Sequence, residues 1–139
     1  CISSAASDVY KRQVWNITKY AIAQYAQAVE NLEPMYLNEK DAQQAGFETT
    51  IAPTSLCAQY QMFQDPQVKV PKGGVHTKQK MSFFKPIQAG DALTARTEVA
   101  EGTDAKGRLQ ITYTTTFTNQ NGEVVCSGVM TNLVPGARK

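Results

Sequence analysis

Apolar residues recur at helical spacing in the first part of the chain. The positions i, i+3, i+4 and i+7 are occupied by Ile22, Tyr25, Ala26 and Val29. This pattern predicts an amphipathic helix of roughly 13 residues that opens near Thr18. The side chain of Asn16 or of Thr18 is expected to cap its first turn.

Two further helices are expected before the middle of the chain. Residues 38–46 begin with Asn38, carry acidic residues in the first turn and end at Gly46, which predicts a short helix. Pro53 is suited to a helix start because its missing N–H needs no partner there. The helix that follows it is expected to be central and buried, with one apolar face formed by Leu56, Tyr60 and Phe63.

From Val75 onward the apolar period changes to two, which predicts strands. The predicted strands are residues 75–86, 91–102, 109–117 and 123–134, and residues 119–122 form a hairpin turn between the last two. Residues 31–38 and 64–74 are expected to be loops. Helices followed by antiparallel strands favour an α+β domain in which a helix packs on one face of the sheet.

Composition narrows the classes of function. The chain has 139 residues, 42% of them hydrophobic, and its formal charge is +2, with one His and three Cys. A near-balanced charge argues against nucleic-acid or anionic-membrane partners. One His and scattered cysteines provide no metal-ligand spacing, and no cofactor is indicated. Cys57 and Cys126 are expected to be buried thiols of a reducing compartment, and we therefore predict a cytoplasmic protein.

The first residues do not fit the rest of the chain. Residues 3–13 can be back-translated, codon for codon, into a transposon adaptor used to prepare DNA sequencing libraries. We therefore expect residues 1–13 to be a translated adaptor and residues 14–139 to form the single native domain. The alternatives are a short polar tail or a signal-peptide remnant, although a signal peptide needs an apolar stretch of roughly 7–15 residues.

Four short strings, in this order, resemble the MaoC-like hotdog dehydratase family. They are Tyr25-Ala-Gln-Ala-Val-Glu-Asn-Leu-Glu-Pro-Met-Tyr, Ala45-Gly-Phe with Ile51-Ala-Pro-Thr, Gly74-Val-His-Thr-Lys-Gln, and Phe84-Lys-Pro-Ile-Gln-Ala-Gly-Asp-Ala-Leu. The resemblance implies a hotdog fold, an antiparallel sheet wrapped around the helix near Pro53, with two such units paired side by side. It also implies hydration or dehydration of acyl thioesters of coenzyme A or acyl carrier protein.

The family's catalytic Asp and His stand five residues apart in a loop that contains a proline. With Pro34 as the anchor, Asn31 falls on the Asp position and Tyr36 on the His position. Neither an amide nor an ordinary phenol is a good base at neutral pH. This pattern resembles the N-terminal half, or non-catalytic subunit, of two-part dehydratases (the FAS1-like dehydratase domain), in which a partner hotdog supplies the acid and base.

The resemblance suggests where substrate would bind. The thioester carbonyl is expected near Pro53, Thr54 and Ser55, where free N–H groups and the helix dipole can stabilise an enolate-like oxygen. His76 is expected to line the thioester entrance or to be an exposed histidine at a strand edge. For Thr54 and Ser55 the alternative is simple capping, and Asp91 is expected to be a turn residue.

Other readings stay open. The chain could be a self-sufficient (R)-3-hydroxyacyl dehydratase or enoyl hydratase that uses His76 or Tyr36 as its base, although Tyr36 is also suited to pack on a neighbouring subunit. It could instead be an acyl-thioester binding module or a thioesterase. A hotdog thioesterase usually has an acidic residue on the central helix, and residues 53–64 contain none. The partners that the resemblance implies are an acyl thioester and a second hotdog subunit, identical or different.

Overall fold

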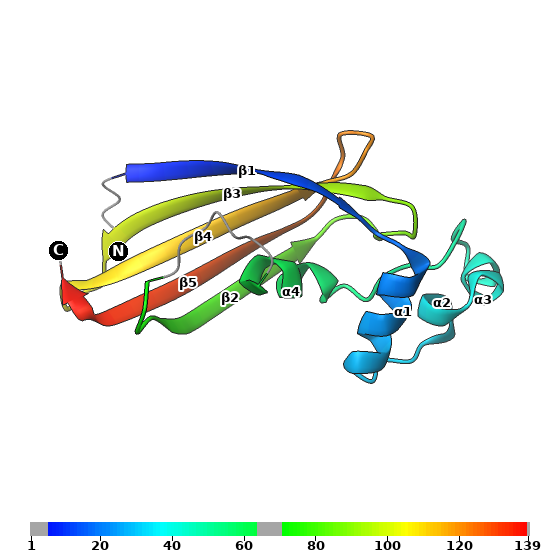
Figure 1. The fold of residues 1–139 in the computed structure, drawn as a ribbon, viewed down its shortest axis with the longest axis horizontal. Coiled ribbons are helices and arrows are strands. Elements are labelled where there is room, and N and C mark those ends of the chain that lie inside the picture. Colours follow the sequence, from blue (N-terminus) through cyan, green and yellow to red (C-terminus); the bar gives the residue numbers. More distant parts are fainter. Residues whose placement is uncertain (1–5, 64–70, 139) are drawn as a thin grey trace.

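The structure, a computed structural model, describes residues 6–63 and 71–138, with side chains described for residues 14–59 and 71–136 (Figure 1). The chain runs through the elements β1 (Ala6–Asn16), α1 (Lys19–Ala28), α2 (Pro34–Leu37), α3 (Glu39–Gln44), α4 (Leu56–Phe63), β2 (Val75–Phe83), β3 (Ala92–Thr103), β4 (Arg108–Thr118) and β5 (Val124–Arg138). The expected order of helices followed by strands is confirmed from α1 onward.

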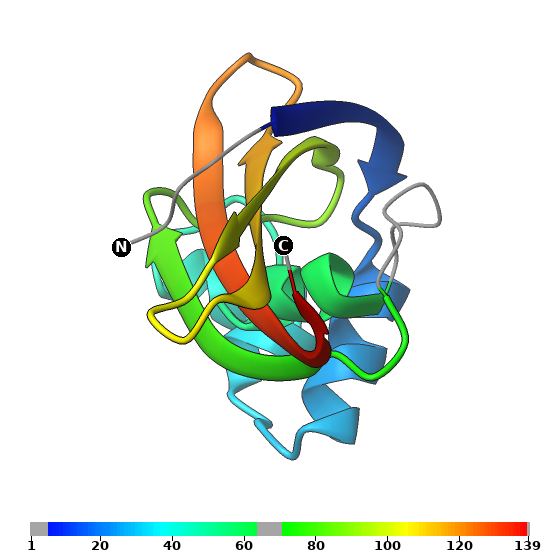
Figure 2. The ribbon, with the colours of Figure 1, turned by 90° about the vertical axis from the view of Figure 1, so that its left-hand side faces the viewer.

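All five strands form one antiparallel sheet in the order β1-β3-β4-β5-β2. The sheet curls around α4, and α1, α2 and α3 gather beside one end of it (Figures 1 and 2). The strands β3, β4 and β5 pair through turns, as the period of two predicts. The edge strand β2 returns to the sheet beside β5, after α4, so α4 lies across the concave face.

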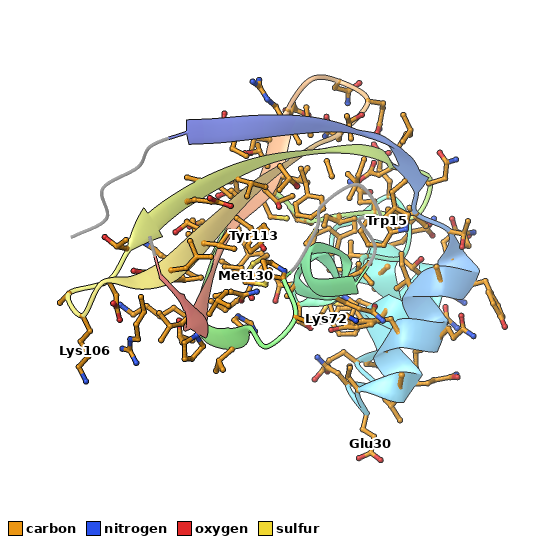
Figure 3. All side chains as sticks on the ribbon, turned by 60° about the vertical axis from the view of Figure 1, so that its left-hand side comes forward. Trp15, Glu30, Lys72, Lys106, Tyr113 and Met130 are labelled. Carbon is orange, nitrogen blue, oxygen red and sulfur yellow. The ribbon has the colours of Figure 1, made fainter. Side chains whose placement is uncertain are left out.

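The core fills the space between α4 and the concave face of the sheet. Alternate residues of β4 are buried, as the period of two requires. Leu56 and Cys57 of α4 pack in one cluster with Leu93, Ala95, Phe117, Val125 and Cys126 from the sheet. Toward the other end of the sheet, Tyr113 and Met130 are register partners inside the curve of the sheet, where they form a second cluster with Ile111 and Val134 (Figure 3).

The helices confirm the predicted caps and correct two boundaries. Thr18 caps α1, since its hydroxyl accepts a hydrogen bond from the Ala21 amide at 3.0 Å. Asn38 caps α3 by accepting from the Lys40 amide at 2.8 Å. The loop expected at residues 31–38 contains the four-residue helix α2, which Pro34 starts. The central helix begins at Leu56, because residues 54 and 55 form a turn after Pro53.

The strand β1 was not expected, because residues 1–13 were interpreted as foreign to the domain. It pairs with β3 from Ala6 to Asn16, and the register shifts between Lys11 and Val14. The irregularity therefore lies at the junction predicted from the codon pattern, but the adaptor origin of residues 1–13 stays a prediction. Of the loop expected at residues 64–74, residues 64–70 lie outside the described residues.

Candidate functional site

A cleft of about 290 Å³ opens between α2, the turn before α4 and the end of β2. Two backbone hydrogen bonds hold its walls together. The Ile51 amide donates to the Met35 carbonyl at 3.2 Å, and the Ala52 amide donates to the Ile87 carbonyl at 2.7 Å. The cleft is lined by Tyr36, Ile51, Ala52, Thr54, Phe83, Phe84, Lys85 and Pro86.

The lining is apolar with a few polar groups, as small-molecule sites generally are. The Tyr36 ring packs against the main core cluster of its own chain. Thr54 is exposed and presents a hydroxyl at the start of the central helix turn. The Lys85 ammonium donates to a Glu123 carboxylate oxygen, so its charge is already paired. No imidazole or carboxylate is among the described side chains that line this cleft.

The three residues at the start of the central helix have different surroundings. Pro53 is fully buried, and its carbonyl accepts from the Leu56 amide at 3.1 Å. Thr54 faces the cleft, whereas the Ser55 hydroxyl is 2.6 Å from the Tyr25 hydroxyl of α1. Ser55 therefore joins α4 to α1, and only Thr54 of the three lines the cleft.

His76 and Asn31 lie apart from the cleft. His76 is exposed near the start of β2, and its Nε2 lies 3.1 Å from the Lys78 carbonyl oxygen. Phe83 stands seven positions further along β2, which is roughly 23 Å along a strand. Asn31 is exposed, and its amide donates to the Ala26 carbonyl at 2.9 Å, just after Glu30 in a left-handed conformation (φ 56°). Asn31 thus closes the end of α1.

A larger groove of about 460 Å³ lies beside the cleft, and two of its three carboxylates, those of Asp91 and Glu123, are occupied within the chain. Asp91 accepts from the Gln88 amide at 2.9 Å and from the Gln120 side chain at 3.1 Å. Glu123 holds Lys85 and the Asn119 side chain. Asp91 is therefore a turn residue, as expected, and the groove is a structural junction between two loops.

The two buried cysteines are free thiols that face one another between α4 and β5. A hydrogen bond with Cys126, together with burial, raises the pKa of the Cys57 thiol far above its ordinary value. A thiol held in its neutral form is a poor nucleophile. The prediction of buried structural thiols is confirmed.

The described part of the chain shows neither a metal-ligand cluster nor a membrane-spanning helix. No group of three or more His, Cys, Asp or Glu side chains there is placed to hold a metal ion. None of the helices there is long and apolar enough to cross a membrane.

Sequence reasoning did not select Phe83, Phe84 or Lys85 as site residues. Phe84 and Lys85 begin the Phe84-Lys-Pro-Ile string, which was used only as a sign of the family, and Phe83 directly precedes it. A run of two aromatic residues at the end of an edge strand is the available signal, because Phe84 is 60% exposed. Phe83 is also exposed, and contiguous apolar surface marks a binding site more often than a single exposed residue does.

The comparisons with known proteins establish the family. The "FAS1-like, dehydratase domain region" family matches residues 6–128. A UPF0336 protein of Mycobacterium tuberculosis is 30% identical over 118 residues, which cover 80% of this chain and 75% of that protein. The chain belongs to the FAS1-like dehydratase domain family.

Solved structures confirm the hotdog fold. The MaoC-like dehydratase from Rhodospirillum rubrum aligns with a TM-score of 0.78 at 24% identity, covering 97% of this chain and 94% of that one. A chain of the HadBC complex, a 3R-hydroxyacyl-ACP dehydratase from Mycobacterium tuberculosis, aligns with a TM-score of 0.71 at 22% identity, covering 91% and 95%. The predicted antiparallel sheet around a central helix is therefore correct.

Proposed function

We propose that this chain is the non-catalytic, substrate-binding half of a two-chain MaoC-like dehydratase or hydratase. It would bind the acyl part of a coenzyme A or acyl-carrier thioester and work beside a catalytic hotdog partner. The observation that carries this proposal is the composition of the cleft, which offers apolar walls, the two hydroxyls of Tyr36 and Thr54, and an already paired lysine.

The chemistry of the reaction explains why this composition matters. Adding or removing water across the α,β bond requires a group that takes a proton near neutral pH. Hydroxyls can orient a carbonyl by hydrogen bonding, but they are weak bases at that pH. Asn31, on the family's Asp position, lies outside the cleft lining. The cleft suits positioning of an acyl thioester, and the acid and base would come from another chain.

The placement of the cleft supports the same proposal. It opens where the central helix begins, so the positive end of the helix dipole points toward it. A thioester carbonyl near Thr54 would gain from that field when negative charge develops on its oxygen. The apolar residues Ile51, Phe83 and Phe84 would then contact the acyl chain.

The test measures binding and turnover separately. The purified chain is titrated with a crotonyl-type coenzyme A thioester by calorimetry, and hydration is followed by the absorbance of the conjugated thioester. We expect binding with negligible turnover, and turnover when a hotdog protein with an intact Asp/His pair is added. Turnover by the chain alone would refute the assignment as a non-catalytic half.

A matched pair of variants locates the binding site. Thr54→Phe fills the cleft with an aromatic ring and should weaken thioester binding at least tenfold. Thr118→Phe places the same ring on the outer face of the sheet, beside Arg96, and should leave binding unchanged. Equal binding by the two variants would place the thioester elsewhere.

The self-sufficient enzyme is a second candidate because Tyr36 lies in the cleft. It predicts that the chain alone turns over substrate and that Tyr36→Phe abolishes the activity. His76→Ala serves as the comparison, because His76 is remote from the cleft. If the chain binds the thioester but no hotdog partner produces turnover, it is a binding module.

A further inference from the structure

A hydrogen bond joins the first helix to the start of the central helix. The Tyr25 hydroxyl of α1 lies 2.6 Å from the hydroxyl of Ser55, the residue directly before α4 (Figure 1). The two residues are 30 positions apart in the sequence. Ser55 also follows Thr54, whose side chain lines the cleft. The bond therefore connects α1 to the turn at which the proposed thioester site lies.

The Ser55 hydroxyl does not cap the helix that follows it. A serine directly before a helix commonly accepts a hydrogen bond from the second or third amide of that helix. Among the side-chain hydrogen bonds of the described residues, the bond of Ser55 is with Tyr25 and with no amide of α4. A local role in helix capping therefore does not account for Ser55, and its contact with α1 needs another explanation.

The Tyr25 side chain is placed to fix the position of Ser55. Its ring packs against the main core cluster, so the contacts of the ring hold the hydroxyl at its tip. On the other side of the same turn, the Ala52 amide donates to the Ile87 carbonyl at 2.7 Å. The turn at Thr54 and Ser55 is thus held from both sides, by the Ala52 backbone before it and by the Tyr25 hydroxyl after it.

Packing between α1 and α4 contributes little beside this bond, because a crevice of about 390 Å³ separates the two helices. The crevice is lined by Ala21, Gln24 and Ala28 of α1 and by Leu56 and Gln59 of α4. Side chains on either side of such a gap lose the dispersion attraction of the missing contacts. The position of the start of α4 relative to α1 therefore depends on the bond between Tyr25 and Ser55.

We propose that Tyr25 is a positioning residue of the thioester site. Its hydroxyl holds Ser55, and with it the amides of Thr54 and Ser55, in place beside the cleft. In the described part of the chain neither amide donates to a backbone carbonyl, so both are available to a thioester carbonyl oxygen. Donors act most strongly when their positions are fixed before the ligand binds. This inference rests on the proposed function, and it adds a residue outside the cleft lining.

The test measures thioester binding in variants that break the hydrogen bond. Tyr25→Phe removes one hydroxyl and keeps the packed ring, and Ser55→Ala removes the other hydroxyl. Calorimetry with a crotonyl-type coenzyme A thioester should show binding about threefold to tenfold weaker in each variant, the range set by one neutral hydrogen bond. The double variant should bind no more weakly than either single variant, because all three lack the same bond.

Matched variants serve as controls. Tyr20→Phe removes the hydroxyl of an exposed tyrosine on the same helix and should leave the affinity unchanged. Ser55→Thr keeps a hydroxyl at this position and should retain most of the affinity. All titrations are made well below the midpoint of unfolding, so that a loss of stability alone does not weaken binding. If circular dichroism shows that Tyr25→Phe does not fold, Ser55→Ala decides the matter.

A spectroscopic measurement separates positioning from a purely structural role. Hydrogen bonds to the thioester carbonyl oxygen lower the infrared stretching frequency of that carbonyl. The decrease on binding should be smaller in Tyr25→Phe than in the wild type, because the donors are no longer held in place. A variant that is merely less stable, with an intact site, would show the decrease of the wild type.

The outcomes distinguish this inference from the proposed function. If the wild type binds no thioester, the proposed function is wrong and the role of Tyr25 falls with it. If the wild type binds, and either the affinity or the carbonyl frequency of Tyr25→Phe equals that of the wild type, only the positioning role is wrong. An equal loss of affinity in Tyr20→Phe would also overturn it, because the effect would then not come from the bond to Ser55.

Discussion

Replacing Asp91 tests whether this residue of the family's Gly-Asp string has a structural role that is independent of the binding cleft. Asp91 is 8% exposed, and its two carboxylate oxygens accept from the Gln88 amide and from the Gln120 side chain. Gln120 in turn accepts from the Ala92 amide at 3.1 Å, so the carboxylate joins the turn at residues 88–91 to the hairpin at residues 119–122. Asp91→Ala removes both bonds and leaves the half-buried Gln88 amide and the exposed Gln120 side chain without this acceptor.

A hydrogen bond to a charged group contributes about 1.5–3 kcal/mol net. Since the two bonds share one carboxylate and the Gln120 donor is exposed to water, we expect Asp91→Ala to lower the free energy of unfolding by about 2 kcal/mol. A domain of this size has about 5–15 kcal/mol in total, so the variant should fold but melt roughly 4–8 °C lower. Asp91→Asn keeps an acceptor for the Gln88 amide but places its own NH₂ group opposite the NH₂ group of Gln120. The free energy of unfolding of this variant should fall by about half as much as that of Asp91→Ala.

The assay is urea unfolding followed by the fluorescence of Trp15, the single tryptophan, which packs against the core. Thioester affinity of the folded variant should be unchanged, because Asp91 does not line the cleft. An Asp91→Ala variant within 1 kcal/mol of the wild type would refute the structural role. An Asn variant as unstable as the Ala variant would also refute it, because the Asn variant keeps the hydrogen bond from the Gln88 amide that the Ala variant loses.

Two further predictions concern stability. Hydrogen bonds from Arg108 hold the pKa of the Asp104 carboxyl below its ordinary value. The ionised carboxylate therefore stabilises the folded protein at any pH above the pKa of Asp104 in the unfolded chain. This stabilisation is lost as the pH falls through the pKa of Asp104 in the folded protein. Thermal melts of Asp104→Asn should therefore show a lower Tm than the wild type at pH 7 and equal values in strong acid; a constant difference would contradict this. Phe117 is fully buried, so Phe117→Ala should cost about 3–5 kcal/mol in urea unfolding, whereas Phe84→Ala, at an exposed site, should cost little. Similar losses for the two would contradict the assigned core.

The parts of the fold that follow from side-chain period were predictable from the sequence. In β4 the alternation puts Tyr113 and Phe117 inside, and it holds even for Thr115, whose buried hydroxyl lies 2.9 Å from that of Thr97. The caps at Thr18 and Asn38 are equally local signals. By contrast, α2 has four residues, which is too short to show a period. The edge strand β1 was missed because residues 1–13 were interpreted as foreign to the domain, so their pattern was not used to predict structure.

The candidate site was only partly predictable, because it depends on contacts between distant segments. Tyr36 and Thr54 are brought together by the hydrogen bonds of Ile51 and Ala52 to two other segments, and no local pattern encodes those bonds. The position of His76 follows from the register of β2, which is shifted by a bulge between His76 and Lys78. A residue count along β2 shows that His76 lies far from the cleft only once Phe83, at the other end of the strand, is known to line it.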